Sequence, residues 1–264
     1  MLPAENSFGL FFLANYDKRN YVVRNIFMRA FFRKILPEPV LRAYAAVKRF
    51  IRKKILHSAP EAERVEFDCD TVYKGHFGVT YRGIPCLKCP FDYVHYQMIL
   101  DALKPDLVIE IGTNIGGGAL YLADLMNIIG RGTVHTIDIA DRADKLLRDH
   151  PRIKLFTRGW EKYDVRNAAG FRKVLVIEDS SHTYENTLGT LRKFGPLVTP
   201  GSYFIVEDGI INEQDREEDY QGGPLRAIRE YLAADDSYVV DRAYCDWFGK
   251  NATANVNGYL KKVK

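Results

Sequence analysis

From Pro105 onward the chain alternates short apolar segments with longer segments of helical period, and this alternation limits the fold more than any other feature. Short segments that are apolar throughout are typical of strands buried on both faces of a sheet, and helices between them join parallel neighbours. The pattern predicts an α/β fold with a mostly parallel, doubly wound sheet and helices on both faces. The predicted strands are residues 107–112, 132–139, 153–159, 173–179, 202–208, 238–243 and 258–263. The predicted helices are residues 117–126, 141–150, 165–170, 183–194 and 224–233.

Two regions precede this alternation. Residues 65–90 combine short apolar stretches with Gly-rich turns and predict strands, and residues 90–103 predict a helix that leads into the sheet. Residues 20–56 have a helical period that is broken near Pro37 and Pro39. We therefore divide the chain into a basic, aromatic-rich helical N-terminal extension, residues 1–60, and a main domain, residues 61–264.

Charge divides the chain in the same way. Residues 1–57 carry 12 Lys and Arg against 3 Asp and Glu, a net charge of +9, whereas the remainder carries 26 against 31, a net charge of −5. An acidic main domain argues against nucleic acid as its partner. The extension can touch an anionic membrane or a lipid-linked acceptor, although an oligomer interface or packing on the main domain is the favoured alternative.

The composition is that of a folded protein in a reducing compartment. Hydrophobic residues make up 47% of the chain, which is enough for a full core. No run of about 18 uncharged apolar residues predicts a membrane-spanning helix, and a signal peptide is not expected. Four cysteines favour a cytoplasmic protein, at most peripheral at a membrane surface. Cys86 and Cys89 lack a second pair at zinc-site spacing, so they are either two small core residues or a metal or redox pair.

The loop after the first predicted strand of the main sheet suggests a cofactor site. Its glycines let the backbone approach a ligand, and the following helix offers free N–H groups. The spacing is not the G-x-G-x-x-G of dinucleotide binding. Glu110, two residues before the first glycine, can hold an ammonium group, which favours S-adenosylmethionine (SAM) over NAD. The loop residues are Gly112, Thr113, Asn114, Gly116 and Gly117.

Residues after the next two strands complete the predicted cofactor site. Asp138 ends the second strand and can accept hydrogen bonds from a ribose, which SAM and NAD share. Gly159 and Trp160 follow the third strand and would lie near the adenine, although Trp160 could equally be a packing residue. The alternative for the whole site is an ordinary Gly-rich turn that binds nothing.

Acidic residues follow the fourth and fifth strands. Asp179 ends one of them, and Glu207 and Asp208 end the other. These strand ends should be neighbours in space, so three carboxylates would converge and repel one another unless a cation neutralises them. Mg²⁺ or Mn²⁺ fits such a site, and Asp179 is assigned to the cofactor site as well. The alternative is that one or two of the acids cap the next helix or bind an arginine.

Residues 84–208 resemble the cephalosporin hydroxylase/rhamnosyl O-methyltransferase family, and their active-site pattern is similar to that of macrolide-sugar O-methyltransferases. The resemblance implies a Rossmann-like class I methyltransferase fold, SAM, Mg²⁺ on the three acids, and homo-oligomers. No two-His-one-carboxylate iron site, which the name hydroxylase would suggest, is apparent in the sequence. The segments that carry the resemblance are Lys88-Cys89-Pro90-Phe91-Asp92, Pro105-Asp106, Glu110-Ile111-Gly112-Thr113, Asp179-Ser180-Ser181-His182 and Val206-Glu207-Asp208.

His182 is the predicted general base. It lies three residues after Asp179, where the next helix should begin beside the metal. An imidazole suits the task because its unperturbed pKa, about 6.5, lies near working pH, and the family resemblance points to the same residue. The alternative is a histidine that caps the helix or orders a water molecule.

Together these signals predict a metal-dependent, SAM-dependent O-methyltransferase. We expect it to act on a hydroxyl of a sugar, a glycan or another polyhydroxylated small molecule, as in natural-product biosynthesis, because two vicinal oxygens can chelate the metal. The alternatives are a phenolic or antibiotic hydroxyl, an NAD(P)-dependent oxidoreductase, which the loop spacing disfavours, and a non-catalytic SAM-binding partner. The complete set of acids with His182 disfavours the last of these.

Overall fold

A computed structural model describes residue 47 and residues 68–264. Apart from Val47, the predicted basic extension, residues 1–60, and its boundary with the main domain lie outside these residues. Residues 68–264 belong to one compact unit, Arg64–Lys264. Every helix in the described part of the chain is too short or too polar to span a bilayer.

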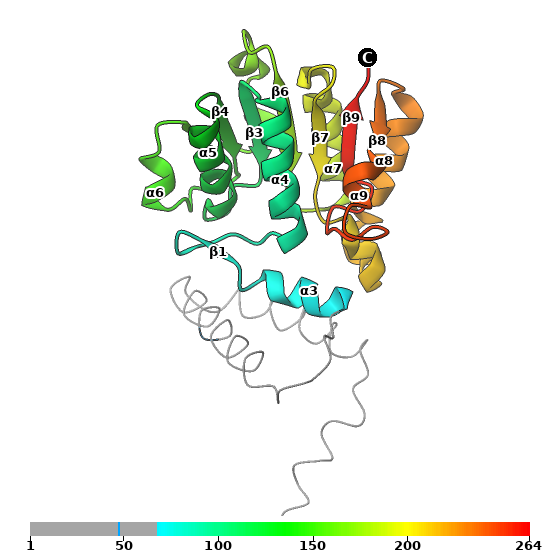
Figure 1. Cartoon of the computed structure of the whole chain (residues 1–264). Helices are drawn as coiled ribbons and strands as arrows, with labels where there is room; N and C mark the ends of the chain where they lie inside the picture. Colours follow the sequence, from blue (N-terminus) through cyan, green and yellow to red (C-terminus); the bar gives the residue numbers. More distant parts are fainter. Residues whose placement is uncertain (1–46, 48–67) are drawn as a thin grey trace, which may run out of the picture. The chain divides into compact units, whose positions relative to one another are not determined.

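A seven-stranded sheet in the order β5-β4-β3-β6-β7-β9-β8 forms the centre of this unit (Figure 1). Neighbouring strands are parallel except β9, which pairs antiparallel with both β7 and β8. The strand order reverses at β3, and ligands of such sheets bind at the carboxyl ends of the strands near this point. All seven predicted strands are present, with shorter ends: β3 (Leu107–Ile111), β4 (Thr133–Ile137), β5 (Ile153–Phe156), β6 (Val174–Glu178), β7 (Tyr203–Val206), β8 (Tyr238–Val240) and β9 (Tyr259–Lys262).

Helices cover both faces of the sheet, as predicted (Figure 1). Successive strand residues point to opposite faces, so Val108 joins one hydrophobic cluster and Ile109 the other. The first cluster contains residues of α4 and α5, and the second contains residues of α7 and α8. The main helices are α4 (Pro90–Leu103), α5 (Gly117–Ile129), α7 (Tyr184–Phe194) and α8 (Gly223–Ala234).

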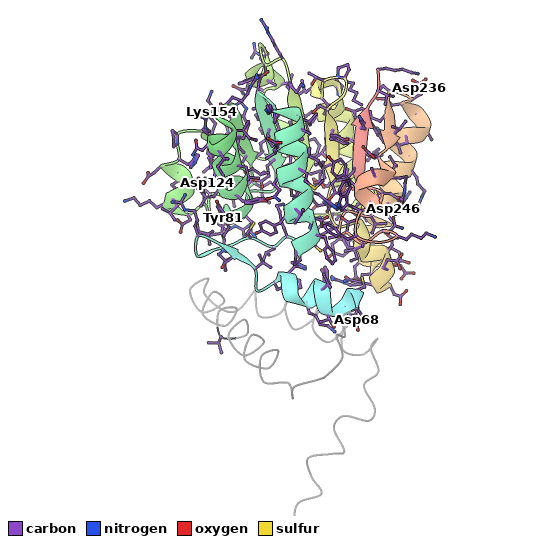
Figure 2. All side chains as sticks on the ribbon, in the orientation of Figure 1. Asp68, Tyr81, Asp124, Lys154, Asp236 and Asp246 are labelled. Atoms are coloured by element: carbon purple, nitrogen blue, oxygen red, sulfur yellow. The ribbon has the colours of Figure 1, made fainter. Side chains whose placement is uncertain are left out.

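The prediction of strands over residues 65–90 is wrong for α3 (Cys69–His76), which is a helix. Asp68 caps its N-terminus by accepting a hydrogen bond from the backbone N–H of Thr71 at 2.7 Å, and this cap starts a helix where the composition suggested a strand. The strand prediction is confirmed for the hairpin of β1 (Thr80–Tyr81) and β2 (Ile84–Pro85). Tyr81 fastens the hairpin to α5 by donating a hydrogen bond to Asp124 at 2.9 Å (Figure 2).

Two other predicted helices are shorter than expected. The helix over residues 141–150 is reduced to α6 (Lys145–Arg148), because Asp144 accepts a hydrogen bond from the N–H of Leu146 at 2.8 Å and the helix begins only there. The helix over residues 165–170 is the 3₁₀ turn η2 (Val165–Ala168). The remaining short elements are α9 (Arg242–Cys245), η1 (Trp160–Lys162), η3 (Gly195–Leu197), η4 (Gly209–Gln214) and η5 (Glu217–Tyr220).

Candidate active site

The loop after β3 touches the segment after β6. Gly112 has a φ of 111°, and a Cβ at this position would overlap the backbone of Asp179, so the close approach requires glycine. The N–H of Asp179 donates to the carbonyl of Ile111 at 2.8 Å. The predicted cofactor loop and the first predicted metal acid are therefore direct neighbours.

The glycines that begin α5 also have a packing role. Gly116 caps the helix in the left-handed conformation, and a Cβ on Gly117 would overlap the carbonyl of Pro85 in β2. Thr113, beside them, shares a 2.7 Å hydrogen bond with the hydroxyl of Thr136 in β4. Among the described residues, no capping side chain bonds the first N–H groups of α5. The cofactor-binding role of these loop residues, Asn114 included, stays a prediction.

Glu110 lies buried in β3 and faces the start of α5. Its carboxylate accepts a hydrogen bond from Thr136 at 2.6 Å. Burial raises the pKa of Glu110 to about 7, against the opposing effects of the Lys88 ammonium and the Thr136 hydroxyl. A carboxyl group with this pKa changes its charge near neutral pH. A cationic ligand group beside it would therefore favour the ionised carboxylate.

Asp138 follows β4 and faces the same loop. One carboxylate oxygen accepts a hydrogen bond from the N–H of Asn114 at 2.7 Å, and the other accepts from the N–H of Ala140 at 3.0 Å. Each oxygen keeps a lone pair for a further donor such as a ribose hydroxyl. The adjacent Ile139 is 78% exposed, which is unusual for a large apolar side chain, and the sequence patterns did not single it out.

The third predicted cofactor segment serves packing. Gly159, with a φ of 79°, donates its N–H to the carbonyl of Asp138 at 2.9 Å. Trp160 donates its indole N–H to Asn186 at 2.7 Å, and its ring fills the space beside Gly189 in α7. These contacts correspond to the packing alternative for Trp160, and a contact with adenine stays a prediction.

Two of the predicted metal acids meet His182. One ligand atom from each of Asp179, His182 and Asp208 lies within 4.8 Å of the others, and the Nε2 atom of His182 lies 3.1 Å from Asp208. Carboxylate oxygens such as those of Asp179 and Asp208 are the ligands that Mg²⁺ or Mn²⁺ prefers, and the imidazole lies beside them. We refer to these three residues as the Asp179–His182–Asp208 cluster.

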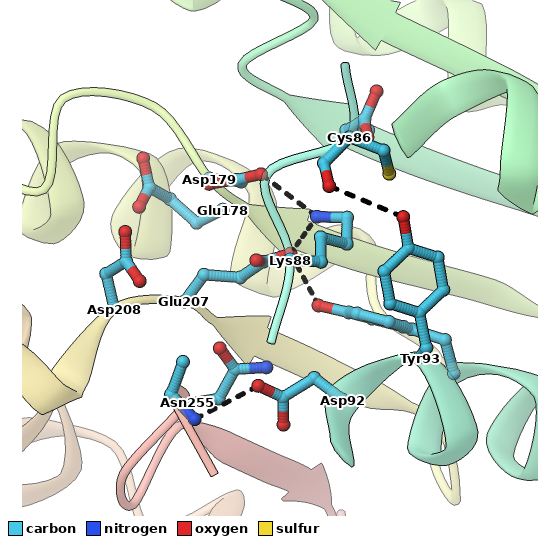
Figure 3. A network of polar contacts seen from close by, with 12 residues as sticks. Cys86, Lys88, Asp92, Tyr93, Glu178, Asp179, Glu207, Asp208 and Asn255 are labelled. Atoms are coloured by element: carbon cyan, nitrogen blue, oxygen red, sulfur yellow. Dashed lines mark hydrogen bonds and ion pairs between the residues drawn. The ribbon is translucent and has the colours of Figure 1, made fainter. Parts of the chain in front are cut away.

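The third predicted metal acid, Glu207, points elsewhere. Its carboxylate accepts 2.5 Å hydrogen bonds from the ammonium of Lys88 and the hydroxyl of Tyr96 (Figure 3). Burial and the neighbouring Asp179 carboxylate raise the pKa of Glu207 well above its usual value, although Lys88 acts in the opposite direction. The metal-binding roles of Asp179, Glu207 and Asp208 stay predictions.

His182 does not open a helix, because α7 begins two residues later at Tyr184. It adopts a left-handed backbone conformation with a φ of 59°, which an L-residue adopts only when its surroundings require it. Its Nδ1 atom is buried and has no hydrogen-bond partner among the described residues. Burial lowers the pKa of His182, but the carboxylates of Asp208 and Asp179 outweigh it, so the pKa is raised.

A group of polar aromatic residues beside His182 was not found from the sequence. The ring of Tyr220 lies 6.3 Å from the ring of His182. Arg216 donates to the hydroxyl of Tyr220 at 2.9 Å and to that of Tyr73, in α3, at 3.3 Å. The signal that could have revealed Tyr73 is the Asp68 cap that begins α3. We call Tyr73, Arg216 and Tyr220 the acceptor wall, after the role that is proposed for them below.

Cys86 and Cys89 are buried, free thiols. Neither belongs to a group of possible metal ligands in the described part of the chain. Their placement agrees with the first of the two interpretations, that of small core residues.

Comparison with known proteins shows the family and the fold of this chain. The family model described as Rhamnosyl O-methyltransferase/CmcI matches residues 73–263. A Rhamnosyl O-methyltransferase of Mycobacterium bovis (strain BCG / Pasteur 1173P2) is 36% identical over 162 residues, which cover 58% of this chain and 65% of the relative. The Mycobacterium leprae (strain TN) protein of the same name is 33% identical over 171 residues, or 60% of this chain and 74% of the relative. The match thus spans just under two thirds of the Mycobacterium bovis relative.

Solved structures share the fold. A CmcI structure with Mg-SAM has a TM-score of 0.56 and 24% identity, over 80% of this chain and 84% of that one. A CmcI structure with SAH has a TM-score of 0.57 and 22% identity, over 80% and 91%. These similarities confirm the predicted methyltransferase-type α/β fold. With a family match over most of its length, the chain belongs to the rhamnosyl O-methyltransferase/CmcI family, as its sequence motifs predicted.

Proposed function

We propose that this chain is a SAM-dependent O-methyltransferase that methylates a hydroxyl of a sugar or glycan with the help of a divalent metal ion. The observation that carries the proposal is the contact between Gly112 and the backbone of Asp179. A cofactor held by the loop after β3 would lie beside the Asp179–His182–Asp208 cluster, where a methyl group can meet its acceptor. Family membership and relatives named Rhamnosyl O-methyltransferase support a sugar acceptor.

On the cofactor side, each residue has a distinct task in this proposal. Asp138 accepts hydrogen bonds from the ribose with the lone pairs that Asn114 and Ala140 leave free. Glu110 balances the charge of the amino end of SAM, and the glycine backbone lets the ligand come close. Ile139, exposed beside Asp138, offers an apolar surface to the adenine.

On the acceptor side, His182 takes the proton of the hydroxyl. Its Nε2 atom faces Asp208 at 3.1 Å, which holds the N–H tautomer at that atom. The Nδ1 atom, which no described residue bonds, then carries the lone pair that accepts the proton, and acceptor binding must make this buried atom accessible. A divalent cation, when bound to the nearby carboxylates, orients the acceptor hydroxyl and lowers its pKa.

The acceptor wall suits a polyhydroxylated ring. Its guanidinium and two phenol groups offer hydrogen-bond partners to hydroxyls, while the rings of Tyr73 and Tyr220 provide apolar surface for C–H faces. A flat phenol would use the aromatic rings but offers fewer hydroxyls to these polar groups than a sugar does. This feature favours a sugar over a phenolic acceptor.

Methyl transfer by the full chain tests the proposal. The chain is incubated with SAM, Mg²⁺ and either a rhamnoside or a catechol, and the products are analysed by mass spectrometry for S-adenosylhomocysteine and a methylated acceptor. We expect methylation of the rhamnoside. Methylation of the catechol alone would favour the phenolic alternative, binding of NAD(P)H in place of SAM would favour an oxidoreductase, and SAM binding without transfer to any acceptor would favour a non-catalytic partner.

Two partner predictions accompany this proposal. We expect a homo-oligomer, which light scattering coupled to size exclusion tests. We also expect residues 1–57, which lie almost wholly outside the described residues, to bind anionic vesicles because of their net charge of +9. Flotation with phosphatidylglycerol vesicles that is unchanged after deletion of residues 1–57, or no flotation at all, would contradict the membrane contact.

A further inference from the structure

Lys88 places a single buried ammonium group between acids from neighbouring strand ends (Figure 3). Its Nζ atom lies 2.9 Å from Asp179, which follows β6, and 2.5 Å from Glu207, which follows β7. Only 1% of the Lys88 side chain is exposed, so water contributes little to its solvation. The two carboxylates therefore provide most of its stabilisation.

Glu110 brings a third acid to the same place. Gly118 is the residue that makes room, because a Cβ there would overlap the Glu110 carboxylate and come within 3.1 Å of the Lys88 side chain. Glu110 and Glu207 are 1% and 4% exposed. Carboxylates buried this deeply repel one another strongly unless a cation lies among them. Lys88 thus lies between the proposed cofactor site and the proposed metal site.

The contacts of Lys88 also explain why Glu207 stays apart from the Asp179–His182–Asp208 cluster. Lys88 and Tyr96 hold the same oxygen of Glu207, each at 2.5 Å, whereas Asp208 pairs with His182. Lys88 also holds the Oδ2 atom of Asp179. It therefore fixes the positions of two acids that belong to the predicted metal set.

We propose that Lys88 is a positioning residue, an internal cation that pairs with Asp179 and Glu207, lowers the charge repulsion among these acids and the nearby Glu110, and keeps this edge of the sheet folded without a divalent ion. The inference rests on the proposed function only where it concerns the metal. Among the described residues, Lys88 is the one cation that forms an ion pair with Asp179 and Glu207. A chain without Lys88 therefore has no cationic side chain paired with these two carboxylates. The protein should then depend on an added divalent ion for stability.

Thermal unfolding of the full chain tests the charge balance without any metal. In EDTA, Lys88→Met should lower the Tm by about 5 °C or more, as expected for a broken buried ion pair. Adding Glu207→Gln should restore at least half of this loss, because the amide keeps an acceptor for Tyr96 but carries no charge. Lys262→Met is the matched control. Among the described residues, this half-buried lysine donates hydrogen bonds to backbone carbonyls, that of Gly195 at 3.2 Å among them, and to no carboxylate. The Tm of Lys262→Met should therefore change neither with Glu207→Gln nor with added metal.

The metal arm uses MgCl₂ alone as the probe. Mg²⁺ should raise the Tm of Lys88→Met by several degrees more than that of the wild type. A Lys88→Met chain with wild-type Tm in EDTA, or a loss that Glu207→Gln does not restore, would overturn the inference. Restoration by Glu207→Gln with no Mg²⁺ effect in any variant would support Lys88 as the internal cation while contradicting the proposed metal. If Lys88→Met does not fold, the double variant decides: a folded double variant supports the inference, and an unfolded one overturns it.

Discussion

The proposed cofactor side and the proposed acceptor side of the candidate site, called the cofactor side and the acceptor side for short, are built in different ways. The cofactor side comes from a single stretch of sequence, residues 110–140. Asp138 accepts hydrogen bonds there from the backbone N–H groups of Asn114 and Ala140, which are only 24 and 2 positions away in the sequence. The acceptor side joins distant segments: Lys88 reaches Asp179 across 91 positions and Glu207 across 119, and Arg216 reaches Tyr73 across 143. Local segments leave a readable sequence pattern, whereas pairings between distant segments, such as those of Lys88 and Arg216, are visible only after folding.

The two sides also differ in how their charges are satisfied. Asp138 is half-buried and bonded by neutral N–H groups, so it remains available to a neutral ribose. On the acceptor side, Glu207 pairs with the ammonium of Lys88 and Asp208 pairs with the imidazole of His182, so each of these carboxylates depends on another side chain. We therefore expect changes on the acceptor side to affect turnover, and changes on the cofactor side to affect SAM affinity.

Metal removal should give the largest effect and should be confined to turnover. Activity is expected to vanish in EDTA and to return with Mg²⁺ or Mn²⁺, because the carboxylates would lose the cation that orients the acceptor. Asp179→Asn should damage kcat far more than it weakens SAM binding measured by calorimetry. Full activity of a metal-stripped preparation would remove the metal from the proposal.

His182→Ala should have the next largest effect. The loss of a general base lowers kcat by roughly 10²–10⁴, with little change in SAM affinity. The wild-type rate should fall as pH drops through the pKa of His182, since the protonated ring accepts no proton. His150→Ala, which removes another histidine paired with an aspartate, is the control and should leave kcat within about twofold. A normal kcat and pH profile in His182→Ala would exclude the role.

Asp138→Ala should reverse the pattern. The ribose hydroxyls lose their acceptor, which costs about 1–3 kcal/mol, or roughly 5–150-fold in the Kd for SAM. The kcat at saturating SAM should change little. Asp141→Ala is the control, because this nearby acid pairs with Arg148 instead of facing the loop. Unchanged affinity in Asp138→Ala would place the ribose elsewhere.

Glu110 should make SAM binding depend on pH. Its pKa is about 7, raised by burial, so the carboxylate that attracts the amino end of SAM becomes protonated as pH falls below 7. Affinity should therefore drop about tenfold from pH 8 to pH 6. Glu110→Gln should bind more weakly at pH 8 and show a flat profile over the same range. A flat profile in the wild type would contradict this role.

The sheet and the acids at its strand ends could be predicted because they depend on local order. Strands that are apolar throughout must be buried, and residues that follow parallel strands must meet at one edge. Helix lengths were less predictable, because the single caps Asp68 and Asp144 decide where α3 and α6 begin. The pairing of Glu207 with Lys88 instead of His182 was not predictable, since it depends on which of these two side chains lies nearer to Glu207 after packing.

Ile139 gives the smallest expected effect and the sharpest test of the difference between the two sides. It is 78% exposed, so its side chain contributes little to folding, and Ile139→Ala should leave the Tm unchanged. If the side chain packs against the adenine, its truncation removes about 1 kcal/mol of apolar contact, or roughly fivefold in the Kd for SAM. Ile128→Ala, at an 83% exposed isoleucine in α5, is the matched control and should change neither the Tm nor the Kd for SAM.

Trp160→Phe should show the opposite result, because loss of the hydrogen bond to Asn186 and of ring contact beside Gly189 lowers the Tm more than it weakens SAM binding. A loss of affinity in Trp160→Phe with none in Ile139→Ala would move the adenine onto the indole and restore Trp160 as the binding residue.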